Sequence, residues 1–112
     1  MEIIARNDVP TQAQEEHLLA MAATQYRLAM GKCGVPAHLH DGLVAYLVHH
    51  RMTGSFLRAV LDNNLRLAFL RADAASAAGL PGLVAFLVDW APMVAWGSED
   101  LVDAWLRREN LG

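Results

Sequence analysis

The segment 54–73, GSFLRAVLDNNLRLAFLRAD, places the strongest constraint on the fold. Its apolar residues recur at helical spacing and predict one long helix over residues 56–71. At about 100° per residue, the charged side chains fall within one narrow sector, which we expect to face solvent: Arg58, Asp62, Arg66 and Asp73. Because the polar strip is so narrow, the helix has to be covered over most of its circumference.

Three polar residues of this segment project from its apolar arc: Asn63, Asn64 and Arg71. An amide in apolar surroundings costs free energy unless its donors and acceptors find partners. Three interpretations stay open for the asparagines. They bond backbone groups at a helix crossing, they fix the register of a homo-oligomer, or they line a small-molecule pocket.

The other segments also predict helices. Thr11 and Gln14 form a capping-box pattern that begins a helix over residues 12–30, after an extended lead-in over residues 1–10. Pro36 suits the first position of a second helix, 36–50. Residues 74–79 are expected to be a short helical turn or a loop. A helix over residues 81–90 is apolar all round and is expected in the core or under a partner, and Ser98 caps a last helix.

Together these segments predict a compact all-α domain that spans residues 1–112. It is expected to be a bundle of four to five helices around one long central helix, with 36–108 as the helical core. Hydrophobic residues make up 54% of the chain and charged residues only 19%. A chain this apolar either packs a dense core or hides surface between copies, so we expect a homo-oligomer.

Charge and cysteine content exclude several classes of partner. The net charge is −3, so neither nucleic acid nor an anionic membrane surface is an expected partner. The longest uncharged stretch, 74–88, is shorter than a membrane span and contains Gly79, Pro81 and Gly82. The N-terminus does not have the pattern of a signal peptide, and the single cysteine, Cys33, fits a reducing compartment. A soluble, cytoplasmic protein is expected.

No catalytic or metal-binding constellation stands out, and no cofactor is expected. Four histidines lie between residues 38 and 50, but no two have the i,i+3 or i,i+4 spacing of a helical metal site: His38, His40, His49 and His50. Cys33 with His38 or His40 leaves a zinc site or a nucleophile conceivable, beside the simpler interpretation of solvated or locally bonded side chains. An enzyme that uses these residues is therefore the third functional hypothesis.

The order of short motifs from Pro36 onward resembles a family of small uncharacterised proteins from tailed-phage and prophage genomes. The residues that carry the resemblance are Tyr46, His49, Gly54-Ser55-Phe56-Leu57, Ala59-Val60-Leu61, Asn63-Asn64-Leu65, Ala72-Asp73, Phe86-Leu87, Ala91-Pro92, Trp96-Gly97-Ser98 and Trp105. Asn64 replaces the usual acid, and the helix before Pro36 is longer than in those proteins. The resemblance implies a phage or prophage accessory gene and supplies no activity, cofactor or catalytic residue.

The first functional hypothesis is a non-enzymatic accessory protein that acts by binding. Its expected target is a host protein, a component of a defence system that it inhibits or sequesters, or a small signal molecule. The second hypothesis is a structural or regulatory oligomer of the phage programme, such as an assembly or lysogeny factor. The candidate binding residues are Arg51, Ser55, Asn63, Asn64, Arg71 and Trp96.

Overall fold

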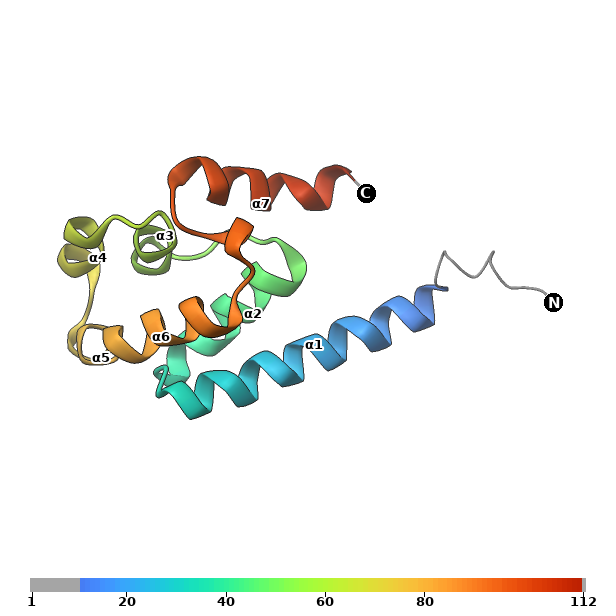
Figure 1. The fold of residues 1–112 in the computed structure, drawn as a ribbon, viewed down its shortest axis with the longest axis horizontal. Coiled ribbons are helices and arrows are strands. Elements are labelled where there is room, and N and C mark those ends of the chain that lie inside the picture. The colour runs from blue at the N-terminus through green and yellow to red at the C-terminus, as the bar shows by residue number, and fades with distance from the viewer. Residues whose placement is uncertain (1–10, 112) are drawn as a thin grey trace.

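The computed structural model describes residues 11–111, with side chains through Arg108 (Figure 1). This part of the chain is helical and contains no strand, which confirms the all-α prediction. Its elements are α1 (Gln12–Cys33), the 3₁₀ turn η2 (Ala37–Leu39), α2 (His40–His49), α3 (Ser55–Leu61), α4 (Leu65–Arg71), α5 (Ala74–Ala78), α6 (Leu80–Trp90), the 3₁₀ turn η3 (Met93–Ala95) and α7 (Glu99–Leu111). The expected lead-in over residues 1–10 lies outside the described residues.

The predicted start of α1 is confirmed. Thr11 Oγ1 accepts a hydrogen bond from the Gln14 backbone N–H at 3.1 Å, and Gln14 Oε1 accepts one from the Thr11 N–H at 2.8 Å. The helix runs to Cys33, beyond the expected end at residue 30, because Gly31 is accommodated as an ordinary helical residue. It stops at Gly34, which has the left-handed φ of 81° that glycine adopts without strain.

The prediction of one long central helix over residues 56–71 is wrong. The helix is interrupted at Asn63, which has a φ of 64° and follows the end of α3. Helix α4 starts after Asn64. The N–H groups of Asn63 and Asn64 donate to the carbonyls of Val60 and Ala59, the pattern of a left-handed helix end. Asn64 Oδ1 then accepts from the Leu67 N–H at 3.0 Å and caps α4.

The asparagines therefore serve as turn and cap residues, because asparagine tolerates left-handed backbone and its side chain competes for backbone N–H groups. This break, together with the short α5, gives seven α-helices in the described chain, and the expected count of four to five was too low. The longest helix is α1, not the segment after Gly54.

The left-handed turn predicts the stability of two variants at one position. Asn63→Ala is expected to lower the free energy of unfolding by about 1–2 kcal/mol, because alanine is strained at positive φ. Asn63→Gly relieves that strain and is expected to stay within about 0.5 kcal/mol of the wild type. Urea unfolding followed by circular dichroism measures both. An Asn63→Ala variant as stable as the wild type would instead indicate one continuous helix through this position.

The core joins α1, α2 and α6 to the pair α3 and α7. Its largest side chains of less than 2% exposure are Tyr46, Phe86, Met30, Leu43, Leu61, Leu83, Leu87 and Val102. Helix α6 contributes Leu83, Phe86 and Leu87 to this core, whereas Val84 and Val88 on its other side are exposed. Helix α6 was expected in the core or under a partner, and within the described chain only one of its faces is buried.

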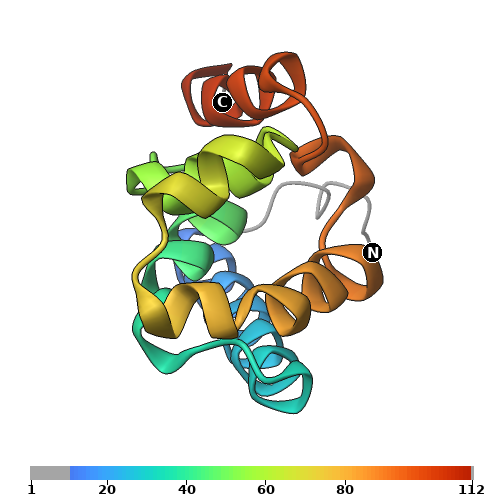
Figure 2. The same cartoon turned by 90° about the vertical axis from the view of Figure 1, so that its left-hand side faces the viewer.

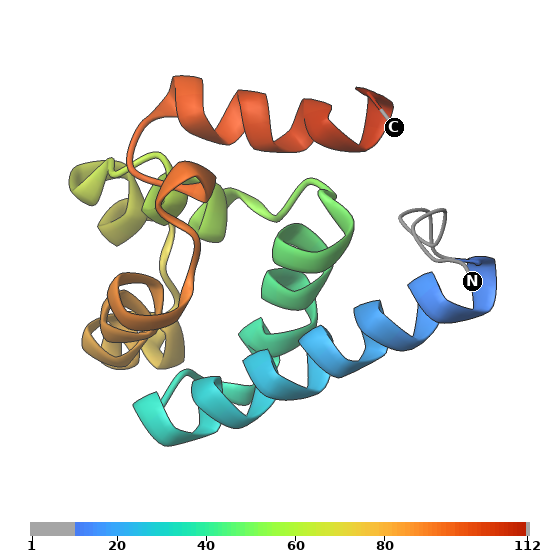
Figure 3. The same ribbon diagram turned by 45° about the vertical axis from the view of Figure 1, so that its right-hand side comes forward.

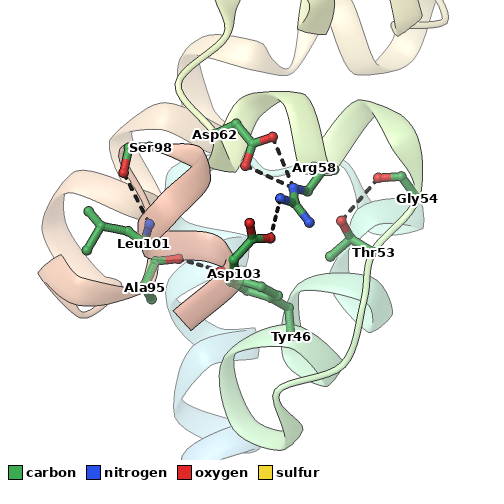
Figure 4. Close-up of polar contacts among 9 residues, drawn as sticks. All are labelled: Tyr46, Thr53, Gly54, Arg58, Asp62, Ala95, Ser98, Leu101 and Asp103. Atoms are coloured by element: carbon green, nitrogen blue, oxygen red, sulfur yellow. Dashed lines mark hydrogen bonds and ion pairs between the residues drawn. The ribbon is translucent and has the colours of Figure 1, made fainter. Parts of the chain in front are cut away.

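Two polar connections hold α7 against the rest of the molecule, and Figure 4 shows the one that Arg58 makes. Trp105 Nε1 donates to the carbonyl of Tyr46 at 2.8 Å, and the Tyr46 hydroxyl donates to the carbonyl of Ala95. Arg58 of α3 binds Asp62 at 2.9 Å and Asp103 of α7 at 2.7 Å. Burial lowers the pKa of Arg58, but its hydrogen bonds to Asp103 and Asp62 outweigh that effect and raise the pKa above its usual value.

Arg58 and Asp62 were expected on a solvent-facing strip, and this expectation is wrong. Their side chains are only 23% and 18% exposed, because α7 covers that face of α3. Arg66 and Asp73, which lie beyond the break, are exposed as expected. None of the described helices has both the length and the apolarity needed to cross a membrane.

Candidate functional site

Five of the six candidate binding residues line two separate cavities. A polar cavity of about 380 Å³ is bounded by His38, Leu39, Gly42, Gly54, Ser55, Phe56, Leu57, Arg71, Asp73 and Ser76. A smaller apolar cavity of about 140 Å³ is bounded by Val60, Asn63, Asn64, Leu65, Ala68, Leu80, Val84 and Trp96. Arg51 lines neither cavity. It follows α2 on the surface, and its N–H donates to the carbonyl of Ala45.

In the polar cavity, a cluster of three side chains lies where α5 begins. Asp73 Oδ1 accepts from the Ser76 N–H at 2.7 Å, and this hydrogen bond lowers the pKa of the Asp73 carboxyl. His38 Nε2 lies 3.0 Å from Ser76 Oγ and 4.0 Å from Asp73 Oδ2. The cluster joins η2 to the start of α5, and sequence reasoning missed all three residues as members of one site.

The serine, histidine and aspartate of this cluster are arranged differently from a hydrolytic triad. In a triad the acid orients one ring nitrogen while the other nitrogen takes the proton of the nucleophile. Here the same nitrogen, His38 Nε2, faces both the hydroxyl and the carboxylate. Ser76 is also 3% exposed, so its hydroxyl is covered by its surroundings. The geometry is that of a helix cap that a histidine reinforces.

Other histidines bond backbone carbonyls nearby. His40 Nε2 donates to the carbonyl of Val35 at 2.9 Å, and His50 Nδ1 donates to that of Trp105 at 2.9 Å. The His50 ring also packs on the Trp105 ring, with 4.4 Å between ring centres. In the described part of the chain, no three side chains of the metal-binding types gather closely enough to hold an ion.

The apolar cavity lies between the α3–α4 turn and α6, whose ribbons face one another in Figure 2. Asn63, Asn64 and Trp96 stand together here because the Gly97 N–H donates to the carbonyl of Leu61 at 2.8 Å and holds Trp96 beside the turn. The break at Asn63 therefore creates the cavity, because it turns α4 away from the axis of α3.

Both helices that line this cavity carry further exposed apolar side chains. Leu65 of α4 is 71% exposed and Val84 of α6 is 39% exposed. Phe69 and Val88 lie one helical turn beyond them on the same helix faces, and they are 66% and 65% exposed. We call the lining of the cavity, together with Phe69 and Val88, the α4–α6 groove.

Helix α4 is apolar on its exposed side because little of it enters the core. Ala68 is its only buried residue, and Leu70 is exposed together with Leu65 and Phe69. The sequence pattern identified these residues as apolar, but it assigned them to the interior of a long helix. The Asn-Asn pair was the signal that α4 is a separate, shallowly packed element.

The charges of α4 are of one sign. Arg66 and Arg71 are both exposed, and no acidic residue lies between Leu65 and Arg71. Asp89 of α6 is the exposed acid on the opposite helix. Helix α4 therefore carries only positive charge, although Arg71 lines the polar cavity and not the groove. This charge favours an acidic partner over a basic one.

Comparison of the chain with known protein families, with characterised proteins and with solved structures found no match.

Proposed function

We propose that this chain is a phage- or prophage-encoded accessory protein that acts by binding a host or defence-system protein. The α4–α6 groove takes an amphipathic helix of that partner, with acidic residues beside its apolar face. The observation that carries the proposal is the exposure of Leu65, Phe69, Val84 and Val88 around an apolar cavity. The resemblance of the ordered motifs to those of small phage proteins supports the genomic origin.

The groove has the features of a helix-binding surface. Monomeric soluble proteins rarely leave contiguous apolar patches open, and such patches mark interaction sites. Leu65 with Phe69, and Val84 with Val88, repeat every four residues, which is the spacing at which a docked helix presents its own apolar side chains. The apolar walls bind such a helix, and Arg66 of α4 favours acidic flanks.

Polar groups at one end of the groove give it direction. Asn63 and Asn64 lie on the surface at the cavity, with half-buried Trp96 beside them. Asn64 Oδ1 is already engaged with the Leu67 N–H. The side-chain amide of Asn63 lies at the edge of the cavity and has both N–H donors and a carbonyl acceptor. It bonds backbone groups at the end of the docked helix.

Site-specific photocrosslinking tests this proposal in the phage's host. A photoreactive residue replaces Val84 or Phe69, and a matched control places it at Met52, which is 74% exposed and lies outside the groove. We expect one host protein to be linked at both groove positions and not at the control. The linked peptide is expected to be amphipathic and acidic. Links equally strong at Met52, or a linked peptide that is basic, would contradict the groove as the site.

A substitution then measures the contribution of the groove to affinity for the linked protein. Val84→Glu puts a charge against apolar side chains and is expected to weaken binding by about 30-fold or more, which is about 2 kcal/mol. Leu28→Glu, on an exposed part of α1, serves as the control and is expected to keep full affinity. Unchanged binding by Val84→Glu would overturn the proposal. Recovery of the protein in purified virions would favour an assembly role instead.

A further inference from the structure

The polar cavity has a buried apolar floor and a polar rim. The floor consists of three core residues, Leu39, Phe56 and Leu57. The volume of about 380 Å³ lies near the lower end of the range of about 300–1,000 Å³ that is typical of small-molecule sites. A cavity of this size takes a small molecule, and its floor favours a ligand with an apolar part.

Two side chains of opposite charge stand on the rim of this cavity. Helices α4 and α5 lie at the same end of the molecule and are joined by Ala72 and Asp73 (Figures 1 and 3). Ala72 is extended, with φ −79° and ψ 135°, and the side chains before and after an extended residue project to the same side. Arg71 and Asp73 therefore both line the cavity, and both are exposed to solvent.

Both charged groups have atoms to which a ligand can bind. Among the residues that the structure describes, no acidic side chain forms an ion pair with Arg71. Asp73 uses Oδ1 to cap α5, but its Oδ2 lies 4.0 Å from His38 Nε2, which is too far for a hydrogen bond. The hydrogen bond from the Ser76 N–H lowers the pKa of the Asp73 carboxyl and keeps it ionised at neutral pH. The guanidinium of Arg71 and Oδ2 of Asp73 are therefore open to a ligand.

We infer that the polar cavity binds a small zwitterion, an α-amino acid with an apolar side chain. The Arg71 guanidinium pairs with the ligand carboxylate, because its planar N–H groups match two carboxylate oxygens. Asp73 Oδ2 accepts a hydrogen bond from the ligand ammonium group, and the apolar side chain of the ligand covers Phe56 and Leu57. A ligand with charge of one sign would attract one of the two rim side chains and repel the other.

A nuclear magnetic resonance titration of the isotope-labelled full chain tests this site. The probes are the natural amino acids, added one at a time. We expect at least one apolar amino acid to bind with a Kd of about 1 mM or below and to shift the amide signals of Asp73 and Ser76. Glycine, which has no side chain to cover the apolar floor, is expected to bind about fivefold more weakly or worse.

Blocked forms of the amino acid that binds best separate the two charges. Its N-acetyl form lacks the ammonium group and its amide lacks the carboxylate, and each is expected to bind about fivefold more weakly or worse. Arg71→Gln is expected to abolish the preference for the free acid over the amide. Asp73→Asn keeps an oxygen to cap α5 and is expected to abolish the preference for the free amine over the N-acetyl form. Arg66→Gln removes an exposed charge of α4 outside the cavity and is expected to change neither preference.

The absence of any amide shift with every amino acid at about 10 mM would overturn the inference. So would blocked forms that bind as tightly as the free amino acid. Acetate or phosphate that binds as tightly would also overturn it, because the cavity would then recognise an anion alone. The polar cavity and the α4–α6 groove share no residue, so Val84→Glu is expected to lose the partner protein and to keep amino-acid binding. Failure at one site is thus distinguishable from failure at the other.

Discussion

Replacing Phe86 with alanine is expected to lower the free energy of unfolding by about 3–5 kcal/mol. Phe86 is fully buried, and its ring meets the Tyr26 ring edge-on with 6.0 Å between their centres. It lies where α6 packs on α1, one of the two most extensive helix contacts in the described chain. Because residues from both helices surround it, the cavity left by the ring cannot collapse without moving one of them.

A second phenylalanine provides the control for this experiment. Phe69 has the same side chain but is 66% exposed, so Phe69→Ala is expected to change the free energy of unfolding by no more than about 0.5 kcal/mol. Urea unfolding of both variants, with m-values compared to the wild type, measures the two effects. Equal losses at the two positions would show that Phe86 is not at the centre of the core.

Adding a methyl group at Gly82 is expected to have the next largest effect. A Cβ atom there would lie 2.4 Å from the carbonyl oxygen of Cys33 and 3.0 Å from that of Gly34. Both are backbone atoms, so α6 and the end of α1 must move apart to admit it. Gly82→Ala is therefore expected to cost about 2–3 kcal/mol, although alanine is the better helix former by about 1 kcal/mol.

Gly31 is the matched control, because it is also a helical glycine and a Cβ atom there meets nothing within 4 Å. Gly31→Ala is expected to raise the free energy of unfolding by about 0.5–1 kcal/mol. The midpoints of thermal and urea unfolding are thus expected to shift in opposite directions for the two variants. A Gly82→Ala variant that matches Gly31→Ala in stability would show that α1 and α6 do not cross at this point.

The helix starts that were correctly anticipated depend on residues close together in the sequence. Thr11 with Gln14, and Ser98 with the Leu101 N–H, cap their helices within one turn, so short motifs determine them. The extent of α1 was less predictable. Gly31 is compatible with a helix, and only the backbone conformation of Gly34 ends it.

The residues of the candidate site come together through contacts between segments that are distant in the sequence. Ser55 and Arg71 were singled out separately, and they line one cavity because the α3–α4 turn brings the two helices side by side. Asn63 and Trp96 lie in the other cavity because the Gly97 N–H reaches the carbonyl of Leu61. His38 and Ser76 meet across the polar cavity although no sequence motif joins them.

The sequence by itself determined that this chain is helical and where most of its helices begin, because periodicity and capping act over a few residues. The Asn-Asn pair is a local turn signal, but only the structure showed that the apolar segment after Gly54 is divided there. It also decided that Arg58 is covered by α7 and that Leu65 and Phe69 face outward. The physical reason is that a repeating apolar pattern records which side chains avoid water, but not which of them another part of the chain actually covers.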